Sequence, residues 1–79
     1  MNIKILGSGC SNCNNLEKIT HQVVKELNIS AEFSKESDFS KIASYGVMKT
    51  PALVINEKVV LTGRVPSKNE LKEIISKYV

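Results

Sequence analysis

The chain has 79 residues, 42% of them hydrophobic and 24% charged, which is a globular composition and a length that predicts one domain over residues 1–79. Eleven Lys/Arg against eight Asp/Glu give a net charge of +3, but the basic residues are scattered and only two Tyr and two Phe accompany them, which argues against a nucleic-acid surface. No apolar stretch is long enough for a signal peptide or a membrane span, so we expect a cytoplasmic protein that does not act on membranes.

The first half of the chain predicts a strand, a helix and a second strand. Residues 2–6 are β-rich and mostly apolar, and the glycines at 7 and 9 end this strand. From Cys13 the apolar residues recur at helical spacing, and Asn28 is a plausible end of that helix. Residues 29–34 then alternate between apolar and polar, as in a strand with unequal faces. The buried stripe of the helix consists of Leu16, Ile19, Thr20, Val23, Val24 and Leu27.

A short helix comes next. Ser37 or Asp38 is suited to cap its start, and Tyr45-Gly46 closes it with glycine at the usual left-handed position. The side chains that we expect to point inward are those of Phe39, Ile42 and Ala43.

The last third predicts a hairpin and a final helix. Residues 52–55 and 58–61 are two short β-rich runs separated only by Asn56-Glu57, as in a hairpin. Residues 62–66 break the pattern, and Ser67 with Glu70 three residues later forms a capping box at the start of the helix. Its buried stripe consists of Leu71, Ile74, Ile75 and Tyr78.

The element order is therefore β-α-β-α-β-β-α, an α/β arrangement. The first two strands are joined through a helix, so they should be parallel with a right-handed crossover, while the last two form an antiparallel pair. We expect a four-stranded mixed sheet with helices on both faces.

Cys10 and Cys13 are the only cysteines of the chain, and they lie where the first strand gives way to the helix. Two intervening residues are enough to close a small disulfide ring, and a helix start beside the first sulfur favours its thiolate. The pair therefore suggests a redox-active dithiol. The alternative is a soft-metal (Cu or Zn) binding or delivery module that uses the same two thiolates. His21, the one further soft ligand, lies on the polar face of the helix, which favours solvation over a role in such a site.

The element order, the motif Cys10-Ser11-Asn12-Cys13 after the first strand and Thr50-Pro51 before the hairpin together resemble the thioredoxin fold in its minimal, glutaredoxin-sized form. The chain is most similar to the small thioredoxin-like proteins of bacteria and archaea known as redox-active disulfide proteins. Residues 45–55 and 63–67 are typical of that group. Copper chaperones also carry two cysteines before their first helix, but their chains end in a strand, whereas residues 67–78 predict a capped helix here.

The resemblance implies a thiol–disulfide oxidoreductase without a cofactor or a metal ion. Cys10 would attack the substrate disulfide and Cys13 would resolve the intermediate. The Thr50–Pro51 peptide bond would be cis, and the backbone of Thr50 would bind the substrate beside the cysteines. The expected partners are a protein or small-molecule disulfide and an unidentified upstream reductase, and we expect a monomer. A dedicated electron carrier is a further possibility within this class.

Two lysines are candidates for tuning the cysteines. Thioredoxins carry an acidic residue on the strand before the motif, and the only charged residue on this strand is Lys4. Lys49 directly precedes Thr50. A positive charge near a cysteine lowers its pKa, so we expect Lys4 and Lys49 to favour the thiolate if they lie close enough.

Overall fold

The computed structural model describes residues 1–8 and 11–78. Within these residues the helices and strands follow the predicted order. They are β1 (Asn2–Leu6), α1 (Ser11–Glu26), β2 (Glu32–Glu36), α2 (Phe39–Ser44), β3 (Ala52–Ile55), β4 (Lys58–Thr62) and α3 (Lys68–Ser76).

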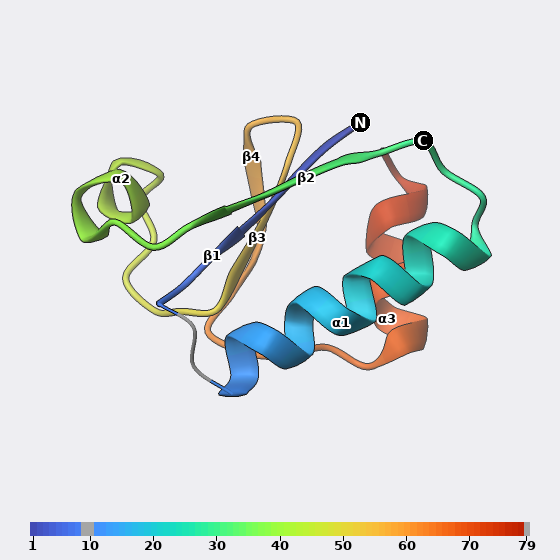
Figure 1. The fold of residues 1–79 in the computed structure, drawn as a ribbon, viewed down its shortest axis with the longest axis horizontal. Helices are drawn as coiled ribbons and strands as arrows, with labels where there is room; N and C mark the ends of the chain where they lie inside the picture. Colours follow the sequence, from blue (N-terminus) through green and yellow to red (C-terminus); the bar gives the residue numbers. More distant parts are fainter. Residues whose placement is uncertain (9–10, 79) are drawn as a thin grey trace.

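The strands form one mixed sheet in the order β2-β1-β3-β4. β1 pairs with β2 in parallel and with β3 antiparallel, and β3 and β4 form the predicted hairpin. β1 and β3 are therefore the central strands, which explains why both are largely apolar (Figure 1). The predicted four-stranded mixed sheet is confirmed.

Helices cover both faces of the sheet, as predicted. α1 and α3 lie together on one face, and the short α2 lies toward the other (Figure 1). The first face carries the larger core, made of Ile3, Ile5, Leu16, Val23, Val24, Leu53, Ile55, Leu61, Leu71 and Ile75. The second face carries a smaller core, made of Leu6, Ile42, Val47, Ala52 and Val54.

The turns and caps follow from local backbone chemistry. Gly46 ends α2 with φ +80°, a conformation that favours glycine. Asn56 and Glu57 both have positive φ (50° and 68°), as a two-residue hairpin turn of type I′ requires. The hydroxyl of Ser67 accepts a hydrogen bond from the backbone N–H of Glu70 and so caps α3. The Glu70 carboxylate accepts hydrogen bonds from the Arg64 guanidinium, so this glutamate fixes the chain before the helix.

Two predicted boundaries are displaced. β2 covers Glu32–Glu36 instead of residues 29–34, because its pairing partner β1 begins at Asn2, opposite Glu32. The N–H of Ile29 bonds to Val24 O, so this residue is tied to the C-terminal end of α1 and does not pair in the sheet. α1 begins at Ser11, two residues before the point where apolar spacing first appears.

The expectation that α2 buries Phe39 and Ala43 is wrong. Phe39 is 82% exposed and Ala43 is exposed as well, whereas Ile42 is buried. The helix has only six residues, and Ile42 is the one side chain that it buries. The side chain of Asp38 accepts hydrogen bonds from the N–H groups of Ser40 and Lys41 and fixes the helix start, as expected for a cap.

We predict that Ile42→Ala and Phe39→Ala differ sharply in stability. Ile42→Ala should lower the free energy of unfolding by about 2–5 kcal/mol, because it leaves a cavity in the smaller core. Phe39→Ala should change it by no more than about 0.5 kcal/mol, because the ring is exposed. Urea unfolding of both variants measures this difference, and equal losses would contradict the placement of α2.

We further predict that Glu26 makes stability depend on pH. The hydrogen bond from Lys68, assisted by Lys72, lowers the pKa of Glu26, although burial opposes the shift. This stabilisation is present above the ordinary carboxyl pKa of 4.5 and is lost as pH falls through the lower folded value. Glu26→Gln should therefore lose less Tm than the wild type between about pH 6 and pH 3, whereas Glu73→Gln on the exposed side of α3 should behave as the wild type. Parallel Tm curves for Glu26→Gln and the wild type would refute the link between α1 and α3.

Candidate active site

Cys13 is the third residue of α1 and lies in its first turn. Its side chain is only 5% exposed, and its sulfur takes part in a disulfide. The other cysteine of the sequence, Cys10, lies outside the described residues. The structure therefore describes the motif from Ser11 to Cys13, which form the start of α1.

Gly7 provides the surface against which Cys13 packs. A Cβ atom built on Gly7 would clash with Sγ of Cys13 and would lie 3.2 Å from its Cβ atom. The backbone cannot move away freely, because the N–H of Gly7 donates a 2.9 Å hydrogen bond to the carbonyl of Glu36. Any side chain at this position would therefore displace the sulfur.

Thr50 lies close to the contact between Gly7 and Cys13. Its Cβ atom is 3.9 Å from the Cβ position built on Gly7. The following peptide bond, Thr50–Pro51, is cis, which is the isomer that the resemblance implies. Thr50 is exposed and Pro51 is fully buried, so the chain passes from the surface to the interior here. Gly7, Cys13 and Thr50 thus converge from three separate segments.

Lys49 lies beside a second loop. The stem of its side chain packs over Gly63, where a built Cβ atom would lie 3.2 Å from the Lys49 Cβ atom. The N–H of Gly63 donates a 2.8 Å hydrogen bond to the carbonyl of Pro51, which ties the two loops together. Lys49 is exposed, and its role in tuning the cysteines stays a prediction.

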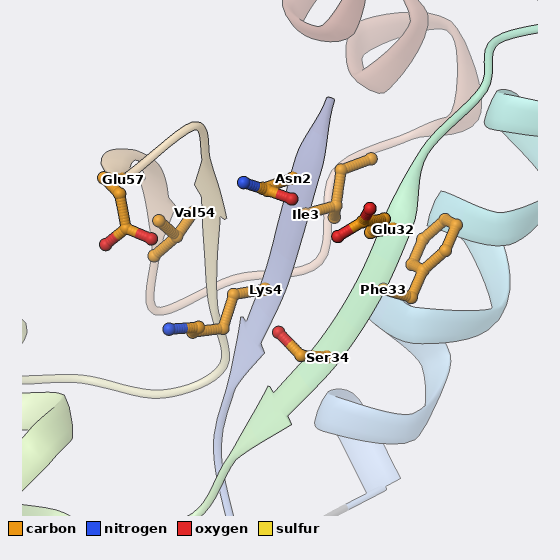
Figure 2. A pocket seen from close by; sticks show the side chains of 8 residues that line it. All are labelled: Asn2, Ile3, Lys4, Glu32, Phe33, Ser34, Val54 and Glu57. Atoms are coloured by element: carbon orange, nitrogen blue, oxygen red, sulfur yellow. The ribbon is translucent and has the colours of Figure 1, made fainter.

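Lys4 has its partners on the sheet face away from α1. Its neighbours Ile3 and Ile5 point into the core under α1 and α3, so Lys4 points to the other side (Figure 2). Its Nζ atom donates a 2.7 Å hydrogen bond to the hydroxyl of Tyr45 and lies 5.2 Å from the centre of that ring. This hydrogen bond raises the pKa of Lys4, against a smaller opposing effect of burial. A tuning role for Lys4 at the cysteines stays a prediction.

His21 is exposed and stacks on Phe33, with ring centres 3.9 Å apart and planes 24° from parallel. Beside this pair, Lys35 Nζ and Glu17 Oε2 form an ion pair at 2.7 Å. Residues 1–8 and 11–78 contain no group of three or more His, Cys, Asp or Glu side chains placed to hold a metal ion.

Sequence reasoning missed two features of this region. Gly7 appeared only as the end of a strand, because no pattern in the chain indicates that Cys13 packs against it. The hydrogen bond between Lys4 and Tyr45 joins residues 41 positions apart. The sequence did contain one signal for it: Lys4 is a charged residue within an otherwise apolar strand, and such a residue needs a polar partner.

The sheet, the disulfide-bonded cysteine in the first turn of α1 and the cis-proline beside it define a protein of the thioredoxin fold. Residues 1–76 match the family described as thioredoxin domain. A thioredoxin of Methanothermobacter thermautotrophicus is 43% identical over 96% of this chain and 99% of its own, and one of Methanocaldococcus jannaschii is 36% identical over 98% and 88%. The chain belongs to the thioredoxin-domain family and is a thiol–disulfide oxidoreductase.

A solved structure shows the same fold. Thioredoxin 1 of Thermosipho africanus is superposed with a TM-score of 0.66 over 99% of this chain and 93% of its own, at 23% identity. In the part of the chain that the structure describes, no helix is both long enough and apolar enough to cross a bilayer.

We predict that Gly7→Ala destabilises the oxidised protein by about 1–3 kcal/mol, because the new methyl group meets a sulfur that the disulfide holds in place. The loss should be smaller in the reduced protein, where Cys13 is free to rotate. The reduction potential should therefore become less negative, by about 30 mV for each 1.4 kcal/mol of difference. Thermal unfolding of both redox states measures the effect, with Ser8→Ala at the exposed neighbouring position as the control. Equal losses in the two states would show that Gly7 does not act through the disulfide.

Proposed function

We propose that this protein reduces disulfides of protein or small-molecule substrates by thiol exchange at Cys10 and Cys13. The observation that carries the proposal is the convergence of the disulfide-bonded Cys13, Gly7 and Thr50 at one end of the central strand. A dithiol at this position is joined to a rigid sheet and lies beside an exposed stretch of backbone. Thiol–disulfide exchange with a peptide substrate needs both a dithiol held in position and a surface that binds the peptide beside it.

The burial of Cys13 supports a division of roles between the two sulfurs. The attacking group must be an accessible thiolate, and Cys13 is only 5% exposed. We therefore assign the attack to Cys10, which directly precedes the first residue of α1, and the resolving step to Cys13. The positive end of the helix dipole stabilises a thiolate at this point of the chain.

In the first step, the Cys10 thiolate attacks one sulfur of the substrate disulfide. The substrate S–S bond breaks, a mixed disulfide forms, and the departing substrate sulfur leaves as a thiolate that takes up a proton from solvent. In the second step, Cys13 as a thiolate attacks the Cys10 sulfur and releases the second substrate thiol. Two electrons have then passed to the substrate, and an upstream dithiol reductase must return two electrons to the protein.

Thr50 and Pro51 are the proposed substrate-binding residues. Thr50 is exposed and lies close to Gly7 and Cys13, which supports the proposal that its backbone pairs with an extended segment next to the substrate disulfide. Pro51 is buried and fixes the direction of this segment. Lys49 lies next to it and would add a positive charge at the rim of the site.

We further propose that the protein acts as a monomer, that residues 1–79 form one domain, and that it works in the cytoplasm. A dithiol that donates electrons needs a reducing compartment, which the cytoplasm provides. The alternative role, soft-metal binding by the same two thiolates, stays a prediction.

We predict that Cys13→Ser traps a covalent mixed disulfide with substrate, because the attack still occurs but the resolving thiolate is missing. Cys10→Ser should trap none. Non-reducing mass spectrometry after incubation with an oxidised protein substrate measures the adduct, and the double serine variant is the control for other modification. Equal trapping by both single variants, or by neither, would contradict the assignment of roles.

The reduction potential of the Cys10–Cys13 pair tests the direction of electron flow. A value of about −270 mV fits a protein that reduces its substrates, whereas a value of about −120 mV would indicate an oxidant.

A further inference from the structure

Tyr45 connects the end of α2 to two places on the sheet face that α2 covers only in part. Its hydroxyl accepts the hydrogen bond from Lys4 on β1 and donates one of 3.2 Å to Oε2 of Glu57 in the hairpin turn. We call this Lys4–Tyr45–Glu57 arrangement the tyrosine bridge. Figure 2 shows Lys4 and Glu57 extending from the sheet on the side opposite to the ring of Phe33, where both line a cavity of about 190 Å³.

One hydroxyl contacts both charged groups of the tyrosine bridge. The ammonium and the carboxylate each form a charge-assisted hydrogen bond with the phenol hydroxyl. The half-buried ring also packs against the smaller core, which includes Ile42 and Val54. The position of Tyr45 is therefore fixed by packing and by two directional contacts.

Tyr45 and the buried Val47 are the two anchored residues before the exposed segment that leads to the active site. Tyr45 is the C-cap of α2, and its successor Gly46 bonds through its N–H to Ala43 O at 2.9 Å. Val47 is buried, but residues 48–50 are exposed, and Met48 is 94% exposed. The segment is anchored again at Pro51.

We propose that Tyr45 is a positioning residue for protein substrates, which acts by holding residues 46–50 in place so that the backbone of Thr50 is ready to pair with an extended peptide. This inference rests on the proposed function. A segment fixed in its binding conformation loses less conformational freedom when a peptide binds, so the benefit appears in substrate affinity. A small disulfide reagent needs no backbone pairing, and it should not depend on the tyrosine bridge.

The test is Tyr45→Phe, which keeps the ring and removes only the hydroxyl. The substitution removes both hydrogen bonds of the hydroxyl, and we expect the KM for insulin disulfides to rise about five-fold with kcat unchanged. The rate with 5,5′-dithiobis(2-nitrobenzoate) and the reduction potential should both stay at the wild-type value. Tyr78→Phe, which removes the hydroxyl of the other tyrosine, is the matched control and should change none of these quantities.

Lys4→Met and Glu57→Gln separate the two halves of the tyrosine bridge. Each should raise the KM for insulin in the same direction, and neither should add to the effect of Tyr45→Phe in a double variant. Should Tyr45→Phe unfold at the assay temperature, Glu57→Gln carries the test, because it keeps the shape of the turn side chain.

The possible failures are distinguishable. An unchanged KM for insulin, or an equal loss with insulin and with the small reagent, would overturn the positioning role of Tyr45 while leaving the exchange reaction intact. If the wild type reduces neither substrate, the proposed function itself fails, and with it the inference that depends on it.

Discussion

The contact between Cys13 and Gly7 is the constraint on which the rest of the site depends. β1 is a central strand, held by hydrogen bonds to β2 on one side and to β3 on the other, so its end is a rigid point. The absence of a side chain at Gly7 lets the first turn of α1 approach that end closely enough for the sulfur to touch the backbone. Cys13 is thereby held against the end of a central strand, and Thr50 lies close to the same contact.

The two faces of the sheet contribute differently to this arrangement. The face under α1 and α3 contains most of the apolar core, and the ion pairs of Glu26 with Lys68 and Lys72 join those helices at its edge. The opposite face is covered only in part, because α2 is six residues long. Where the apolar packing on this face ends, polar contacts stabilise it instead. The tyrosine bridge is such a contact, and in our proposal it holds the start of the loop before Pro51.

Most of the fold was predictable because each signal was local. Each of these signals involves residues that are close together in the sequence. Examples are the capping side chain of Ser67, the turn at Asn56-Glu57 and the apolar stripe of α1. The failures concern relations over longer distances. The start of β2 depends on pairing with β1, and the exposure of Phe39 depends on how a helix of less than two turns meets the sheet. Periodicity carries no information on either point.

The position of Lys4 changes how a proton can leave the resolving cysteine. An acidic residue on this strand would serve as a proton acceptor, but Lys4 cannot, because its hydrogen bond to Tyr45 raises its pKa and keeps it protonated at neutral pH. The ammonium is moreover directed to Tyr45, on the face away from the helix that carries Cys13. In the proposed exchange, the Cys13 proton therefore passes to solvent or to the departing substrate sulfur. The second step then follows the thiolate fraction of Cys13 itself, so its rate rises with pH until that thiol is ionised.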